Sequence, residues 1–207
     1  MRNFASILAL AAVVALLGCD KGATTKNDKS TTPVAKTGDT PKPAGSAGVI
    51  NLDNTTITFV GTKTGGKHDG GFKAITGSVK PADGDITAAA ISVEIDTDSL
   101  WADDPKLTGH LKSPDFFDVK KFPKASFTST AIKADKKDDN THLIAGELTL
   151  HGTKKEISFP AKVTATDDLL TLDSTFTFDR TDFGIAFAPD KVDKVVTVKV
   201  ALKVARK

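Results

Sequence analysis

The C-terminal part of the chain alternates apolar and polar side chains with a period of two, and this pattern restricts the fold more than any other. From Val196 to Val204, valine or leucine fills every second position, and threonine, lysine and alanine fill the positions between them. Because successive side chains of a β-strand point to opposite faces, the pattern predicts a strand with one buried face. At about 3.3 Å per residue, a strand from Val195 to Val204 would be roughly 33 Å long.

Seven further segments repeat this alternation and are separated by turn-forming residues. The clearest, AISVEI, places Ile91 and Val93 on one face, and TLDSTFTFD does the same with Phe176 and Phe178. The eight predicted strands are 57–62, 72–80, 90–95, 125–133, 142–152, 156–166, 171–179 and 195–204. The predicted turns are Gly65-Gly66, Gly70-Gly71 and Asp83-Gly84.

One segment departs from the strand pattern and predicts a short helix over 105–112. Asp104 is a suitable N-cap, and Pro105 is favoured at the first helical position. Leu107 and Leu111 are four residues apart and would share one face of the helix. Pro114 would end it.

The strand pattern indicates an all-β, antiparallel domain. Eight strands that are apolar on one face must curl or pair to bury that face, in a barrel or a two-sheet sandwich. Long strands with local connections favour a barrel of about eight strands with one short helix, since closure removes exposed edges. A barrel of that size is either filled by its own side chains or hollow enough for a small ligand.

The first 19 residues look like a targeting signal. Arg2 precedes an apolar run at 7–17, which is too short to span a bilayer of roughly 30 Å as a helix. The ending LLGC resembles a bacterial lipobox, in which Cys19 would become the acylated first residue; an ordinary signal peptide is the alternative. Residues 20–48 hold almost no large apolar side chain and are expected to form a flexible linker. The globular domain is then 49–207, lipid-anchored in a bacterial cell envelope and facing the periplasm or extracytoplasmic space.

Composition and motifs argue against several functions. Cys19 is the only cysteine, so an intramolecular disulfide and a cysteine-type zinc site are excluded. Residues 49–207 carry 22 basic and 23 acidic side chains, which does not favour nucleic-acid binding. The histidines form neither H-x-H nor H-E-x-x-H, and no G-x-S-x-G nucleophile elbow or phosphate-binding glycine loop occurs. We therefore expect no metal, no cofactor and no enzymatic activity.

Three stretches in the right order resemble the YceI-like family: HLKSPDFFDVKKFPKASFTST, GELTLHGTKKEISFPA and DRTDFGI. They match its His-Leu pair, Phe-Phe-Asp, F-x-S-T, G-x-L-T-x-x-G-x-x-K hairpin and R-x-D-F-G, and the resemblance covers residues 50–204. It implies a lipocalin-like antiparallel barrel that binds a polyisoprenoid or a related long-chain amphiphilic lipid inside.

On this basis the inward-facing residues become candidate ligand-binding residues. Phe116, Phe117 and Phe122 are expected to close one end of the barrel as an irregular plug, or to be core residues and no more. Arg180 could hold a phosphate or carboxylate head group, or pair with Asp179 or Asp182. The candidate set is Ile91, Val93, Phe116, Phe127, Leu148, Phe176, Phe178, Arg180, Val198 and Val200.

Two histidines have expected structural roles. His110 matches the family's His-Leu pair and is expected to be a buried, hydrogen-bonded side chain that fixes the helix to the barrel. His151 precedes Gly152 at a hairpin turn and is expected to be exposed.

The preferred function is therefore a membrane-tethered protein that sequesters or carries a lipid in a hollow barrel. The first alternative is a barrel with a packed interior that acts as a protein-interaction module. The second is an enzyme acting on a lipid, which would need a polar cluster at the cavity floor.

Overall fold

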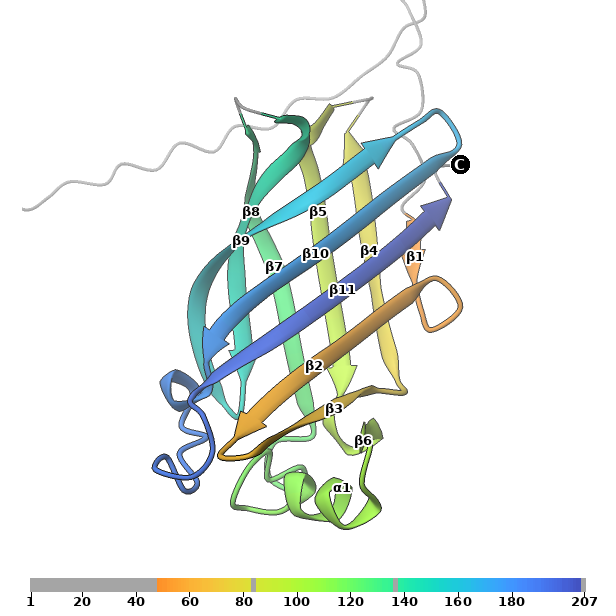
Figure 1. Ribbon diagram of the computed structural model, residues 1–207. Coiled ribbons are helices and arrows are strands. Elements are labelled where there is room, and N and C mark those ends of the chain that lie inside the picture. The colour runs from red at the N-terminus through yellow and green to blue at the C-terminus, as the bar shows by residue number, and fades with distance from the viewer. Residues whose placement is uncertain (1–47, 83–84, 136–137, 206–207) are drawn as a thin grey trace, which may run out of the picture. The chain divides into compact units, whose positions relative to one another are not determined.

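Each of the eight predicted strands overlaps a long strand of the structure, and three short strands accompany them (Figure 1). The structure is a computed structural model that describes residues 48–82, 85–135 and 138–205; the predicted signal, the linker up to residue 47 and the turn at 83–84 lie outside this part. The eight long strands are β2 (Thr55–Lys63), β4 (Ile75–Ala82), β5 (Asp85–Asp96), β7 (Lys124–Asp135), β8 (Asp138–Leu150), β9 (Thr153–Ala165), β10 (Leu169–Asp179) and β11 (Val195–Ala205). The short ones are β1 (Gly48–Ile50), β3 (Gly66–Phe72) and β6 (Leu100–Ala102).

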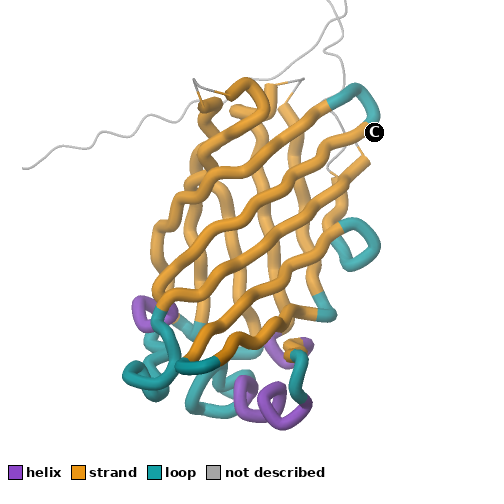
Figure 2. The backbone as a smooth tube through the Cα atoms, viewed as in Figure 1, coloured by secondary structure: helices purple, strands orange, loops and turns teal. Residues whose placement is uncertain are grey.

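The strands form one antiparallel sheet that curls into a barrel (Figure 2). The strand order is β1-β4-β5-β7-β8-β9-β10-β11-β2-β3-β6. β1 is hydrogen-bonded to β4, and its Gly48 lies directly against Val204 of β11, so the first strand of the sheet packs against β11 and closes the curl there. The expected all-β barrel is confirmed, although its strand number is higher than the eight predicted.

Two sequence-based assignments between residues 70 and 80 are wrong. Gly70-Gly71 is not a turn but the end of β3, where a side chain on Gly70 would collide with the Phe59 ring and the Trp101 carbonyl. The predicted strand 72–80 is divided at residues 73–74, where the Ser99 hydroxyl accepts hydrogen bonds from the N–H groups of both residues. These glycines serve close tertiary packing, which a local turn signal does not distinguish.

The predicted helix is confirmed as α1 (Pro105–Lys112). The Asp104 carboxylate accepts hydrogen bonds from the N–H groups of Lys106, at 2.7 Å, and Leu107, at 3.1 Å. α1 lies at the end of the barrel next to β6 (Figure 1), and its Leu111 side chain is buried there.

Two clusters of buried apolar side chains hold the barrel together. The larger one extends from the end opposite α1 and includes Ile50, Val79, Ile144, Leu170 and Val204. The smaller one lies beneath α1 and is made of Leu100, Leu111, Phe116, Ala125, Leu150, Phe183 and Ile185. Side chains that are only half-buried border both clusters, which indicates a space between them.

Candidate ligand-binding cavity

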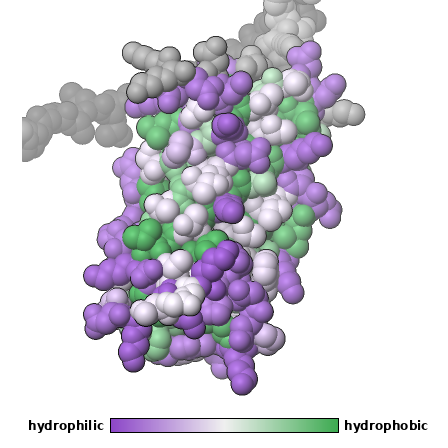
Figure 3. Space-filling model, in the orientation of Figure 1, coloured by the Kyte–Doolittle hydropathy of each residue, from purple (hydrophilic) through white to green (hydrophobic). Residues whose placement is uncertain are grey.

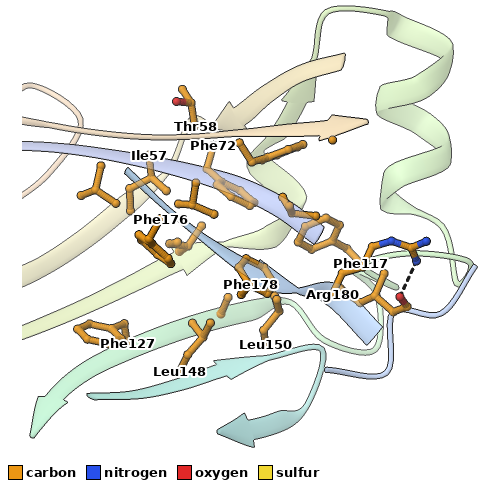
Figure 4. Close-up of a pocket in the computed structure, with 18 of the residues that line it drawn as sticks. Ile57, Thr58, Phe72, Phe117, Phe127, Leu148, Leu150, Phe176, Phe178 and Arg180 are labelled. Atoms are coloured by element: carbon orange, nitrogen blue, oxygen red, sulfur yellow. Dashed lines mark hydrogen bonds between the residues drawn. The ribbon is translucent and has the colours of Figure 1, made fainter. Parts of the chain in front are cut away.

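A cavity of about 380 Å³ occupies this space inside the barrel. Its wall is built from the inward-facing positions of the strands, so rings and branched aliphatic side chains point toward one another across it (Figure 4). The volume falls within the roughly 300–1,000 Å³ of typical small-molecule sites. All ten candidate residues line the cavity: Ile91, Val93, Phe116, Phe127, Leu148, Phe176, Phe178, Arg180, Val198 and Val200. Their contact with a ligand stays a prediction.

Phenylalanine rings dominate the middle of the cavity wall. Phe159 of β9 stacks on Phe176 of β10 with ring centroids 4.3 Å apart, and it also contacts Phe127 of β7 at 5.5 Å. Phe127 fits because the neighbouring strand β8 has a glycine, Gly146, beside its ring: a Cβ at Gly146 would be 2.5 Å from both the Phe127 ring and the Thr128 carbonyl oxygen. The position of the Phe127 ring therefore requires a glycine at residue 146 of the neighbouring strand.

The far end of the cavity is closed by packed aliphatic side chains. Ile50, Ile144, Leu172 and Leu202 line it and are at most 5% exposed. They belong to the larger core cluster, so the cavity ends where the packed core begins. The exposed or partly exposed polar lining residues, Lys63, His68, His110 and Asp193, lie at the other end, which carries α1.

The rim at that end has two sides. On one side, β2 is joined to segment 184–194: the Asp193 N–H donates to the Thr62 carbonyl at 2.9 Å, and Lys63 forms an isolated bridge with Val192. On the other side lie α1 and the irregular segment 113–123, which contribute Leu107, His110, Phe116 and Phe117. We call the opening between these two sides the mouth.

Two histidines, His68 and His110, lie at the mouth. His110 of α1 lies edge-on to Phe187 of segment 184–194, with ring centroids 4.9 Å apart, and its Nε2 lies 2.8 Å from an Asp115 carboxylate oxygen. His68 of β3 has its Nδ1 2.9 Å from Asp103. The Asp69 N–H and the His68 side chain lower the pKa of Asp103.

The expectation for His110 is correct in part. Its hydrogen bond is present and links two parts of the rim, but the side chain is 41% exposed rather than buried, because it stands at the opening.

Arg180 does not form either ion pair that the sequence suggested. Its buried guanidinium donates to four backbone carbonyls of segment 184–194: Ile185 at 2.6 Å, Phe187 and Val192 at 2.9 Å, and Asp193 at 3.0 Å. Burial lowers its pKa, and the charges of Asp179 and Asp193 oppose this. The expected structural role is present, but its partners are carbonyl groups that a sequence motif cannot reveal.

The two aspartates that were candidate partners of Arg180 have other roles. Asp182 pairs with Lys155 at 3.0 Å. Asp179 accepts hydrogen bonds from the N–H and hydroxyl groups of Thr181.

Two of the three rings of the expected plug, those of Phe116 and Phe117, line the cavity. Phe116 is buried. Phe117 reaches the cavity, where its ring centroid lies 6.0 Å from that of Phe72. Phe122 instead packs outside the cavity, against His151 of the β8–β9 hairpin at 4.4 Å. His151 is accordingly half-buried, not exposed as expected, and its Nδ1 donates to the Phe183 carbonyl at 3.2 Å.

Several lining residues were not among the candidates. Ile57 and Phe59 alternate within a predicted strand, so the period-two pattern could have identified them. Phe187 lies in an irregular segment with no periodic signal, and it is held at the mouth by the hydrogen bond from Arg180 to its carbonyl and by ring contacts with His110 and Phe116. Sequence patterns therefore find the wall of the cavity but not its rim.

The residues that the structure describes hold neither a metal-ligand cluster nor a membrane-spanning helix. Within 48–82, 85–135 and 138–205, no three histidine, cysteine, aspartate or glutamate side chains are grouped so that they could hold a metal ion. Over the same residues, no helix has the length and apolar character needed to cross a bilayer.

An antiparallel barrel with an apolar internal cavity open at one end defines a lipocalin-like class of protein. The chain matches the model of the YceI-like domain over residues 49–204 and belongs to the YceI-like family. The expected family resemblance is thus confirmed.

Individual relatives agree with this assignment. A UPF0312 protein of Pseudomonas putida (strain W619) is 36% identical over 128 residues, which cover 56% of this chain and 66% of that protein, just under two thirds. The crystal structure of Burkholderia cenocepacia BcnA has a TM-score of 0.66 at 24% identity, covering 72% of this chain and 95% of BcnA. A polyisoprenoid binding domain from Saccharophagus degradans, implicated in plant cell wall breakdown, has a TM-score of 0.61 at 14% identity, covering 78% and 98%. At these identities the two structures show a shared fold.

Proposed function

We propose that this protein binds a polyisoprenoid or similar single-chain amphiphilic lipid in its cavity and carries or sequesters it. The observation that carries the proposal is the 380 Å³ cavity with a wall of aromatic and aliphatic side chains. Burial of apolar ligand surface would supply about 25 cal/mol per Å², less the cost of association. The polyisoprenoid-binding domain with the same fold supports the choice of ligand class by analogy.

The two alternatives fit the cavity less well. An interaction module with a packed interior does not need a hollow bordered by half-buried rings. A lipid-modifying enzyme needs a polar cluster at the cavity floor, where Ile50, Ile144 and Leu202 lie instead. We therefore propose a binding protein.

We further propose that the protein acts at a membrane to which the acylated Cys19 tethers it, on the extracytoplasmic side. One acyl chain gives only marginal membrane binding, whereas two or three hold a protein stably. Cys19→Ser should move the protein from the membrane fraction to the soluble fraction. Continued membrane association of this variant would count against the tether.

Lipid carriage is tested by purifying the full chain without detergent and identifying bound lipids by mass spectrometry of an organic extract. Val198→Trp places a large side chain in the cavity and should abolish co-purification. Thr177→Trp, which lies on the outer face of the neighbouring strand, is the matched control and should leave the lipid in place. Equal lipid content in the two variants, or none in the wild-type protein and none after addition, would refute the proposal.

A further inference from the structure

The interior of the cavity offers a ligand almost no hydrogen-bonding partner. Four of the Arg180 N–H bonds already go to backbone carbonyls. Among the lining hydroxyl groups, those of Thr55 and Thr62 donate to Asn54 and Asp193. Thr58 points away from the cavity (Figure 4), and Ser126 precedes the inward-facing Phe127 and so falls on the outer face. A polar head group buried there would lose its hydrogen bonds to water without replacement.

Polar side chains that can meet a head group are gathered at the mouth. Lys63, His68, His110 and Asp193 line this end of the cavity. Lys63 and Asp193 are exposed, and the His68 and His110 side chains are 31% and 41% exposed. A head group among them would stay in contact with water.

The two ends of the cavity therefore differ in the part of an amphiphile that they can accept. The closed end, at Ile144 and Leu202, accepts only hydrocarbon. The mouth, between α1 and segment 184–194, accepts a polar group in contact with water, because Phe187 is 36% exposed there and the His110 side chain is 41% exposed.

From this asymmetry we infer that the protein holds its ligand tail-first, with the head group exposed at the mouth, and selects amphiphiles by their tails rather than by their heads. This inference rests on the proposed function and adds the orientation and selectivity of binding. A lipid held in this way presents its head group to a second macromolecule. The arrangement suits a carrier that delivers a lipid better than a protein that sequesters it.

The orientation can be measured with two biotin-labelled forms of one prenyl alcohol, farnesol. One form carries biotin on the oxygen through a short linker, and the other carries it at the far end of the chain. Both compete with a fluorescent apolar probe for the full-length, delipidated protein, and streptavidin is then added to capture the complexes. Val198→Trp serves as the variant without room for the tail.

The head-labelled form should bind within about threefold of farnesol and be captured with the protein, whereas the tail-labelled form should bind at least tenfold more weakly. Farnesyl phosphate and farnesylamine should bind within about fivefold of farnesol. Equal or tighter binding of the tail-labelled form would overturn the inference, as would loss of binding by the head-labelled form while farnesol binds. If farnesol and all other added lipids fail to bind, the proposed function is refuted, and the inference about orientation is refuted with it.

Discussion

At the scale of single residues, Arg180 organises one side of the cavity mouth. A planar guanidinium with five N–H groups can serve several carbonyls at once, which a lysine cannot. Arg180→Met would leave four carbonyls of segment 184–194 without this donor. We expect the free energy of unfolding to fall by about 2–4 kcal/mol, measured by urea denaturation.

The control for this prediction is Lys199→Met, which removes a positive charge from the exposed face of β11. It should change stability by no more than about 0.5 kcal/mol. A similar small effect of Arg180→Met would mean that its four hydrogen bonds do not hold the segment.

Gly146 shows a different constraint at the same scale, since it makes room for the Phe127 ring. Gly146→Ala would bring a methyl group to 2.5 Å from the Thr128 carbonyl oxygen, which belongs to the backbone and cannot easily move. We expect a loss of about 1–3 kcal/mol in thermal or urea unfolding. Gly61→Ala, where a Cβ would have no neighbour within 4 Å, is the matched control and should be neutral or slightly stabilising. Equal effects of the two changes would contradict this account.

At the scale of elements, α1 depends on its N-cap. Asp104→Ala removes the acceptor of two helix N–H groups and should cost about 0.5–2 kcal/mol. Asp104→Asn keeps an acceptor and should cost less. Hydrogen exchange of the α1 amides would show whether the loss is local to the mouth, as we expect. Unchanged protection of α1 in the alanine variant would show that packing alone holds the helix.

Carboxylates at the ends of strands make the fold sensitive to acid. The Thr181 hydroxyl and N–H groups lower the pKa of Asp179 below its ordinary value of 3.8, and Thr87 and Thr141 act similarly on Asp85 and Asp138. Because the folded-state pKa is the lower one, this stabilisation is present above the unfolded-state pKa and is lost as the pH falls through the folded-state pKa.

The melting temperature should accordingly fall as the pH drops below about 4. Asp179→Asn removes one of these titrating groups and should make the decline between pH 5 and pH 2 less steep. An identical pH profile for the wild-type protein and the variant would show that the Asp179 hydrogen bonds do not contribute.

At the scale of the whole molecule, the sequence predicts the wall of the barrel well. Alternation along long strands such as β10 and β11 determines which side chains face inward, so the eight candidate residues that belong to strands line the cavity. Phe116 and Arg180 also line it but lie outside the strands. Local capping chemistry likewise placed α1 at its observed residues.

The remaining features depend on contacts between distant segments. Gly70-Gly71 lies in a strand because Phe59 and Trp101 pack against it. Phe122 lies outside the cavity because its ring packs against His151 of the β8–β9 hairpin. Whether the barrel was hollow could not be predicted either, because alternation shows where side chains point but not whether they fill the space between them. On the outer face shown in Figure 3, polar and apolar residues are mixed.

An interior that can accept a hydrocarbon chain is the central requirement of the proposed function. Calorimetric titration of the delipidated full-length protein with farnesol at several temperatures tests this directly. We expect saturable binding of one molecule per barrel with a negative heat-capacity change, the mark of apolar burial, and loss of this signal in Val198→Trp but not in Thr177→Trp. No saturable binding, or the same binding in Val198→Trp as in the wild-type protein, would contradict it.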